Sequence, residues 1–217
     1  RFTKNIFIMM NAQTAESQAQ VTPAKALELL KEGNQRFVEN KNADRDLLGQ
    51  VAQTKSGQFP FATVLHCIDS RVSAELLFDQ GIGDLFSIRI AGNFVNEDIL
   101  GSMEFACKLA GTKVLVVLGH THCGAVKGAC DRAELGNLTA MLSKITPVVD
   151  AVEVNYEQKG SANKELVQEV ADHNVKRALE QIIEHSPVLA EMETNGELLI
   201  QGGMYDIETG KVTFEGY

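Results

Sequence analysis

The sequence predicts an α/β protein with a mostly parallel central sheet of four strands, an antiparallel edge strand and helices on both faces. Strand-like runs alternate along the chain with longer helical segments, which is typical of a parallel sheet covered by helices. The runs over 61–66 and 114–118 are apolar or β-branched at nearly every position, as in strands buried on both faces. Near the end of the chain, Glu208-Thr209-Gly210 is a hairpin-like turn that predicts the antiparallel edge.

The remaining elements follow from capping residues and periodicity. Thr22-Pro23 marks a helix start, because threonine is a favoured N-cap and proline suits the first helical position. The helix over 23–40 has apolar residues near helical spacing and an expected i,i+4 ion pair between Glu32 and Arg36. Further helices are expected at 44–55, 73–79, 95–110, 123–130, 137–157 and 163–185, and further strands at 85–90, 197–203 and 211–215.

Length and composition predict one domain over 22–217, preceded by a disordered or leader segment over 1–21. A chain of 217 residues is long enough to bury a full hydrophobic core. Residues 11–20 lack bulky apolar groups, so disorder is expected there. The apolar run at 6–10 is too short for a signal peptide, and a leader upstream of a true start at Met10 is the preferred interpretation.

Charge and cysteine content limit the partners and the compartment. A formal net charge of −9 disfavours nucleic-acid binding, and no run approaches the roughly 20 apolar residues of a membrane span. Four cysteines are too few for a disulfide scaffold in a chain of this length, so a reducing compartment with metal-binding thiolates is expected. We therefore expect a cytoplasmic protein, or a periplasmic one if residues 1–20 are the remnant of a signal peptide.

Candidate metal ligands follow two of the expected strands. His120 and Cys123 come directly after the run over 114–118, and Cys67 comes directly after the run over 61–66. In open parallel sheets, sites form beyond the carboxyl ends of the strands, so these residues meet if the two strands are neighbours. One histidine and two cysteines match a catalytic zinc site with an open fourth position. The competing interpretation is that the cysteines are packed as small apolar residues.

The loop after Cys67 favours the metal interpretation. Asp69 and Arg71 lie two residues apart in this loop. By themselves they could be no more than a surface ion pair. Beside a metal, however, an aspartate can accept a hydrogen bond from bound water, and an arginine can hold that aspartate ionised.

Four ordered motifs resemble the β-class of carbonic anhydrases. They are Cys67-Ile68-Asp69-Ser70-Arg71, Arg89-Ile90-Ala91-Gly92-Asn93, Gly101-Ser102-Met103-Glu104-Phe105-Ala106 and Gly119-His120-Thr121-His122-Cys123-Gly124. The helical stretch Gly33-Asn34-Gln35-Arg36-Phe37 is also similar to bacterial members. The likeness runs from about residue 22 to the end of the chain, and the four motifs together are far more specific than any one of them.

The resemblance implies a zinc-dependent enzyme that reversibly hydrates carbon dioxide to bicarbonate and a proton. It implies Zn2+ ligands at Cys67, His120 and Cys123, and a catalytic dyad of Asp69 and Arg71. It also implies a homodimer or homotetramer in which a neighbouring subunit supplies part of the substrate pocket. The implied substrate-side residues are Gln58, Phe86, Gly92 and Phe105. Phe105 departs from the plant-like pattern, which has tyrosine there, so a hydroxyl role in proton transfer is in doubt.

The expected mechanism uses a hydroxide generated on the zinc ion as the nucleophile. Two thiolates neutralise the charge of the ion, so its water should be less acidic than in a three-histidine site. We predict a hydration rate that rises with pH above about 7, and a flat profile from about pH 6 to 9 would contradict this. The family's secondary bicarbonate pocket uses a tryptophan, and this chain has none. We therefore expect the open, non-allosteric type, in which Asp69 pairs with Arg71 and stays off the metal.

Two alternatives remain. A carbon disulfide or carbonyl sulfide hydrolase has the same fold and metal site, and access to the pocket would decide between the substrates. A zinc-stabilised assembly protein without activity would have no use for Asp69 and Arg71. Other chemically active residues receive lesser roles. His122 is a candidate proton shuttle, and the residues expected to be satisfied, solvated or inert are His66, His173, His185, Cys107 and Cys130.

Overall fold

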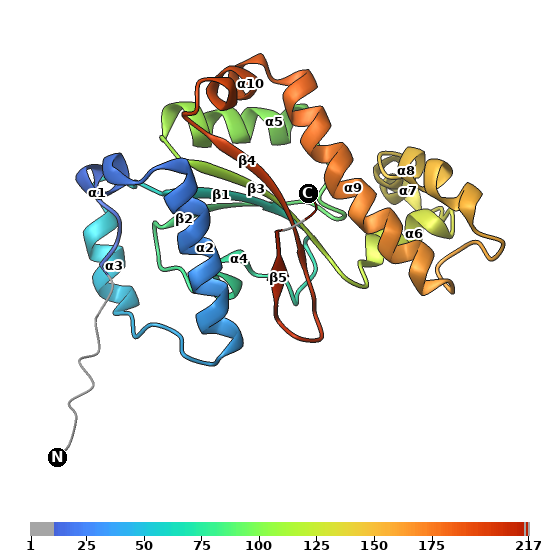
Figure 1. Ribbon diagram of the computed structural model, residues 1–217, viewed down its shortest axis with the longest axis horizontal. Coiled ribbons are helices and arrows are strands. Elements are labelled where there is room, and N and C mark those ends of the chain that lie inside the picture. Colours follow the sequence, from blue (N-terminus) through green and yellow to red (C-terminus); the bar gives the residue numbers. More distant parts are fainter. Residues whose placement is uncertain (1–10, 215, 217) are drawn as a thin grey trace.

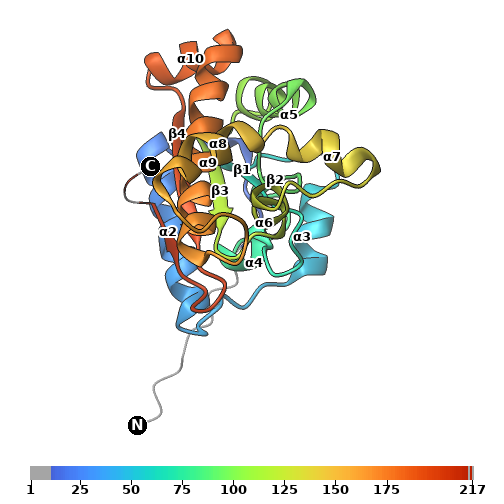
Figure 2. The ribbon, with the colours of Figure 1, turned by 90° about the vertical axis from the view of Figure 1, so that its right-hand side faces the viewer.

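The computed structural model describes residues 11–214 and 216, and it contains a five-stranded sheet in the order β2-β1-β3-β4-β5. The strands are β1 (Ala62–His66), β2 (Leu85–Arg89), β3 (Val114–His120), β4 (Leu199–Tyr205) and β5 (Val212–Thr213). The first four run parallel, and β5 pairs antiparallel with β4. Figure 2 shows β4, β3, β1 and β2 following one another across the molecule. The predicted fold class is confirmed.

Two groups of helices cover the two faces of the sheet (Figure 1). One face carries α2 (Pro23–Val38) and α4 (Ala74–Leu77). The opposite face carries α5 (Glu97–Glu104), α6 (Gly124–Cys130), α8 (Thr146–Val152), α9 (Lys164–His185) and α10 (Pro187–Thr194). The other described helical segments are α1 (Ala15–Gln20), α3 (Leu47–Thr54), α7 (Gly136–Leu142), the π-helical η1 (Phe105–Leu109) and the short η2 (Glu153–Asn155).

β3 lies inside the sheet, and its side chains alternate between two hydrophobic cores. Val114, Val116 and Leu118 pack with α2 and α4, whereas Leu115 and Val117 pack with the helices of the opposite face. All five side chains are buried because both faces of this parallel sheet are covered.

Gly119 ends this apolar run, and a larger residue there would have to displace neighbouring side chains. A Cβ atom there would lie 2.7 Å from Val175 Cγ2 and 2.8 Å from Met204 Cε. Val175 belongs to α9 and Met204 to β4, so side chains from both elements pack against the backbone of β3 at this point. The next residue along the chain is His120.

α2 begins as the sequence predicts. Thr22 Oγ1 accepts a hydrogen bond from the Lys25 N–H, and Pro23 lies in the first turn. A Cβ atom at Gly33 would lie 1.8 Å from the carbonyl oxygen of Phe78, which caps α4. The two helices therefore meet through their backbones at this point.

The expected ion pair between Glu32 and Arg36 is wrong. Arg36 Nε donates to the Asp79 carboxylate, and Glu32 lies 3.3 Å from Lys25 instead. Arg45 also donates to Asp79. Asp79 is buried, and a buried carboxylate must be paired, so it attracts both guanidinium groups more strongly than an exposed glutamate does.

The expected disorder over 11–20 is also wrong. These residues include α1, and Gln18 Nε2 donates to the carbonyl oxygens of Pro60 and Ala110 at 2.7 and 2.9 Å. A segment without bulky apolar groups is therefore anchored by amide-to-carbonyl hydrogen bonds. The predicted leader interpretation concerns residues 1–10, which lie outside the described residues.

Other differences affect helix boundaries. The helix expected over 137–157 is divided into α7, α8 and η2, with turn residues at 143–145. The helix expected over 95–110 is α5 continued by η1. α10 was not predicted, although Ser186 caps it and Pro187 lies in its first turn. Among the described residues, no helix is both long enough and apolar enough to span a membrane.

Candidate metal centre

Three ligand-type side chains meet where β1 and β3 end. Cys67 follows β1 and His120 is the last residue of β3, and these strands are parallel neighbours. Cys123 immediately precedes α6. The ligand atoms of the three residues all lie within 4.8 Å of one another. Each residue is at most 3% exposed, so the group is shielded from solvent. The ends of β1 and β3 lie next to each other, as predicted, and this brings Cys67 close to His120 and Cys123.

The ring of His120 is oriented toward the two thiols by its own backbone contact. Its Nδ1 donates to the Thr121 carbonyl oxygen at 2.9 Å, since a carbonyl can only accept. The opposite nitrogen, Nε2, is buried and has no hydrogen-bond partner within the described chain. Buried polar atoms are nearly always satisfied, and a metal ion would satisfy this one. The residues present therefore fit a bound metal.

The two thiols form a coupled pair. Cys67 Sγ and Cys123 Sγ are 3.9 Å apart. A hydrogen bond from the Cys123 thiol lowers the pKa of Cys67 to about 4. The same contact, together with burial, raises the pKa of Cys123. One thiolate is thus favoured before any cation enters, and a cation between the sulfurs would favour the second.

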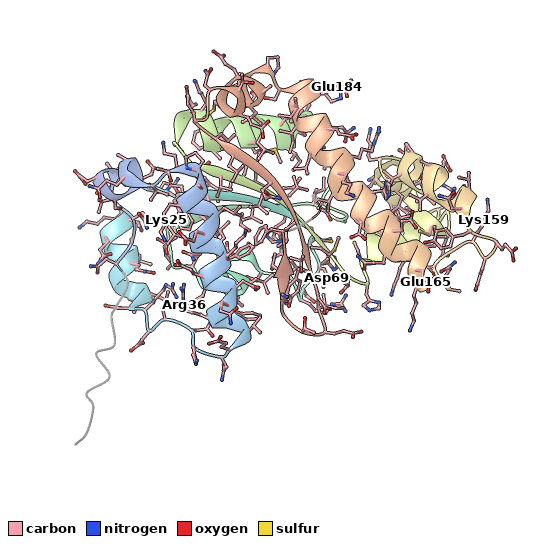
Figure 3. All side chains as sticks on the ribbon, viewed as in Figure 1. Lys25, Arg36, Asp69, Lys159, Glu165 and Glu184 are labelled. Atoms are coloured by element: carbon pink, nitrogen blue, oxygen red, sulfur yellow. The ribbon has the colours of Figure 1, made fainter. Side chains whose placement is uncertain are left out.

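Asp69 and Arg71 form a bidentate ion pair beside this group. Arg71 Nε and Nη2 donate to the two carboxylate oxygens at 2.9 and 2.7 Å, and the Arg71 backbone N–H donates at 2.9 Å. These hydrogen bonds hold the pKa of Asp69 well below its usual range. Asp69 Oδ2 lies 4.0 Å from His120 Nε2. Figure 3 marks Asp69 at the end of the sheet where the parallel strands finish.

A small hollow of about 260 Å³ opens next to Cys67 and Asp69. Most of its lining is apolar, and it comes from the loops after β1 and β2 and from α6 and α7. The lining residues are Cys67, Ile68, Asp69, Ala91, Gly124, Ala125, Gly128, Leu138, Met141 and Leu142. The centre is therefore reachable by a small apolar molecule.

Of the predicted substrate-side residues, only Gly92 contacts the metal group within one chain. Its N–H donates to Cys67 Sγ at 3.4 Å. Phe86 and Phe105 lie against each other, with ring centroids 6.2 Å apart, and they line a different hollow. Gln58 is exposed and precedes β1, whereas Cys67 follows it. A five-residue strand spans roughly 16 Å, so Gln58 lies at the other end of β1 from the metal group.

The lesser histidines and cysteines stay outside the group. His66 is buried, with its Nε2 2.7 Å from Ser87 Oγ, and burial lowers its pKa to about 4. His122 is half-buried and lies 3.3 Å from Glu208. Burial raises the pKa of both Cys107 and Cys130 to about 11. Neither of these cysteines lies in the ligand cluster.

Two residues without a predicted role support the loops of the centre. Arg89 donates to the carbonyl oxygens of Cys67 and Asp69 at 3.3 and 3.0 Å. Asn174 Nδ2 donates to the Gly92 carbonyl oxygen at 2.8 Å. Arg89 lies in one of the family-like motifs, which is a usable signal. Asn174 lies in the middle of α9, where nothing in the sequence distinguishes it from a solvated polar residue.

Comparison with known proteins identifies the family to which this geometry belongs. A sequence model described as "Carbonic anhydrase" matches residues 62–212. The chain belongs to the carbonic anhydrase family. Carbonic anhydrase 2 of Mycobacterium tuberculosis is 32% identical over 196 residues, which cover 90% of this chain and 94% of the relative. A carbonic anhydrase of Pseudomonas aeruginosa is 31% identical and covers 83% of this chain and 84% of the relative.

Solved structures of carbonic anhydrases agree on the class. The β-carbonic anhydrase CafA of Aspergillus fumigatus is 26% identical, with a TM-score of 0.70 over 89% of this chain and 90% of that chain. The β-carbonic anhydrase CcaA is 28% identical, with a TM-score of 0.69 over 86% of this chain and 93% of that chain. The chain is therefore a β-class carbonic anhydrase enzyme, which confirms the resemblance seen in its motifs.

Proposed function

We propose that this carbonic anhydrase reversibly hydrates carbon dioxide to bicarbonate with a zinc ion held by Cys67, His120 and Cys123. The observation that carries the proposal is a buried cluster beside an apolar hollow. It consists of two sulfurs and one imidazole nitrogen that has no hydrogen-bond partner among the described residues. Three protein ligands with space for a fourth are typical of catalytic zinc sites, whereas structural sites fill all four positions.

Zinc in this position would lower the pKa of a bound water molecule toward neutrality. The protein's own part is to orient the reactants. Asp69 is ionised by its contacts with Arg71 and faces the hollow, so it can accept a hydrogen bond from water there. The apolar side chains of Leu138, Met141 and Leu142 suit uncharged carbon dioxide better than charged bicarbonate, which favours release of the product.

We also propose the open, non-allosteric type of enzyme. Both carboxylate oxygens of Asp69 are engaged by Arg71, which supports a resting position for Asp69 away from the metal ligands. The chain contains no tryptophan, which the secondary bicarbonate pocket would require. A crystal structure of the zinc-loaded protein tests this. It should be determined at about pH 7.5 or above, where aspartate and arginine side chains are both charged. Asp69 bound to zinc would contradict it.

A homo-oligomer is part of the proposal. So is a single domain over residues 22–217, to which α1 is attached by the hydrogen bonds of Gln18. Gln58, Phe86 and Phe105 do not reach the metal group of their own chain, so a second copy would have to bring them there. A β-carbonic anhydrase of Sordaria macrospora with the same fold is described as tetrameric. We further propose a cytoplasmic location, supported by four cysteines that are all unpaired.

The test combines a zinc count with stopped-flow carbon dioxide hydration. We expect about one zinc ion per chain, and we expect the zinc-loaded protein to hydrate carbon dioxide. Cys123→Ser should lose zinc and activity together. Cys130→Ser is the matched control, because this buried thiol lies outside the ligand cluster, and it should keep both. Full zinc without hydration would support a non-catalytic assembly protein, and turnover of carbon disulfide or carbonyl sulfide alone would support the hydrolase alternative.

A further inference from the structure

A buried chain of hydrogen bonds connects α9 to one of the ligand sulfurs. Asn174 Nδ2 donates to the Gly92 carbonyl oxygen at 2.8 Å, and the Gly92 N–H donates to Cys67 Sγ at 3.4 Å. Asn174 is 3% exposed, although α9 buries mostly apolar residues around it. A buried amide in such surroundings costs free energy unless it makes a specific contact. The amide of Asn174 donates to the glycine that touches the candidate metal ligand.

We propose that Asn174 is a positioning residue for the metal centre, acting through Gly92 on the sulfur of Cys67. This inference rests on the proposed zinc function. Asn174 does not line the hollow, and its hydrogen bond to the Gly92 carbonyl oxygen is what connects its side chain to the ligand group.

The Gly92 backbone needs such an anchor because of its conformation. Gly92 has a φ of 82°, in the region that favours glycine. A Cβ atom there would also lie 2.5 Å from Ile145 Cδ1. Glycine is therefore required, and glycine has the most freely moving backbone of any residue. The turn is closed on one side by the Asn93 N–H, which donates to the Ile90 carbonyl oxygen at 3.0 Å. Asn174 restrains it on the other side.

Holding this turn matters for the sulfur because an N–H donor withdraws charge from a thiolate. Hydrogen bonds around a ligand sulfur tune the properties of the bound metal. Without Asn174, the Gly92 carbonyl loses its partner and the turn can rotate, which lengthens the contact to Cys67. Cys67 would then donate more charge to the metal and would be less firmly placed.

The test needs a readout other than hydration rate. Asn174→Ala removes the amide, and Asn174→Leu removes it while keeping the side-chain volume similar. Asn163→Ala is the matched control, because Asn163 caps the same helix through Leu166 N without reaching Gly92. Loss of this cap lowers helix stability by about 1 kcal/mol, so it reports what a purely structural defect of α9 does.

Two measurements on loaded protein decide the question. The first is release of zinc to a chelator, and we expect about tenfold faster release for both Asn174 variants. The second is the thiolate-to-cobalt charge-transfer band of the cobalt-substituted protein, which should move to longer wavelength as Cys67 becomes more electron-rich. The Asn163→Ala protein should show a lower thermal midpoint but unchanged zinc release and an unchanged band.

Two results would overturn the inference. One is an Asn174→Leu protein that folds and has wild-type zinc release and band position. The other is an Asn163→Ala protein that changes both measurements as much as the Asn174 variants do. Failure of the proposed function looks different, because the wild-type protein itself would then bind no zinc or would not hydrate carbon dioxide.

Discussion

Asp69 lies between two groups that compete for its carboxylate. One is the candidate metal group, and the other is the guanidinium of Arg71. Asp69 Oδ2 lies only 4.0 Å from His120 Nε2, the buried nitrogen that fits a bound metal. Three donors from Arg71 hold the Asp69 carboxylate back. Arg71 itself is half exposed, so this restraint depends on geometry and not on burial.

Replacing Arg71 should therefore impair turnover without emptying the site. We expect Arg71→Gln to lower kcat/KM by about a hundredfold, because Asp69 is freed to bind the metal and is lost as a hydrogen-bond acceptor. Arg71→Lys keeps the charge but not the bidentate contact, so its loss should be smaller. Zinc content and stopped-flow kinetics are the measurements. Unchanged kinetics in Arg71→Gln would show that the ion pair has no catalytic role.

At the scale of single residues, the chemically active side chains could be predicted from the sequence. The residues that position them could not. Cys67, His120 and Cys123 were predictable because each lies where a strand-like run ends and because the four motifs together resemble one family. Asn174 was not, because its importance comes from one backbone carbonyl on another element. No periodicity reports such a contact.

Among the elements, α2 and α4 are joined by a contact that tolerates no side chain. The Phe78 carbonyl occupies the space that a Cβ atom at Gly33 would fill. In an isolated helix alanine is favoured over glycine by about 1 kcal/mol. Here packing reverses that preference.

We expect Gly33→Ala to destabilise the protein by about 3 kcal/mol, because the helices must separate to accept the methyl group. Gly101→Ala is the matched control, since this glycine is also helical and a Cβ atom there meets nothing within 4 Å in the described chain. That variant should be neutral or more stable by about 0.5 kcal/mol. Thermal unfolding at equal protein concentration compares them, and a Gly33→Ala protein as stable as Gly101→Ala would refute the argument.

The loop after α2 is fixed by the buried ion pairs of Asp79. Burial favours the neutral acid, but hydrogen bonds from Arg36, the Ala43 N–H and Arg45 outweigh it and lower the pKa of Asp79. A lowered carboxyl pKa gives stability that is present above the unfolded value of about 3.9 and is lost as pH falls through the folded value.

Asp79→Asn should consequently cost about 3 kcal/mol at pH 7, because two guanidinium groups lose their buried partner. The deficit should shrink as the pH falls below about 4, where the wild-type carboxylate also becomes protonated. Asp44→Asn makes the same charge change at an exposed position in this loop and is the control. Chemical denaturation at several pH values measures the deficit, and a deficit that stayed constant with pH would contradict a role for the ionised carboxylate.

The elements also show which signals in a sequence are decisive. α2 was predicted because its cap and its apolar spacing agree. α1 was predicted to be disordered because it lacks bulky apolar residues, and it is held by the amide of Gln18 instead. α10 has both a capping serine and a proline at its start, so its sequence does carry the usual signals of a helix start.

For the molecule as a whole, the distance between Gln58 and the metal group is the most consequential fact. If Gln58 acts at the centre, it acts at the centre of another copy. The fold could be predicted from alternating elements and terminal turns. The partner of Gln58 could not, since a single chain does not state which of its surfaces meets a second copy.

Mixing two inactive variants tests this arrangement. Gln58→Ala keeps its own metal group, and Cys67→Ser keeps its own Gln58, so each supplies what the other lacks. In randomly mixed dimers, half are hybrids with one intact site, and we expect recovery of about a quarter of wild-type hydration. Cys67→Ser mixed with Asp69→Asn is the control and should recover nothing, because both residues belong to the same half of the site. No recovery in the first mixture, despite proven hybrids, would exclude a shared site.

Successive side chains of β3 point into two different hydrophobic cores, and this affects how the register of the strand is fixed. Its inward and outward residues are all valines and leucines of similar size, so sliding the strand by one position would exchange near equivalents. The apolar side chains alone therefore do little to fix the register of β3 against its neighbouring strands. Gly119 helps to fix this register, because a slip would place a side chain against Val175 and Met204. Gly119 has no side chain with which to bind a metal or a substrate. It nevertheless helps to set the position of His120, the last residue of β3, along the strand.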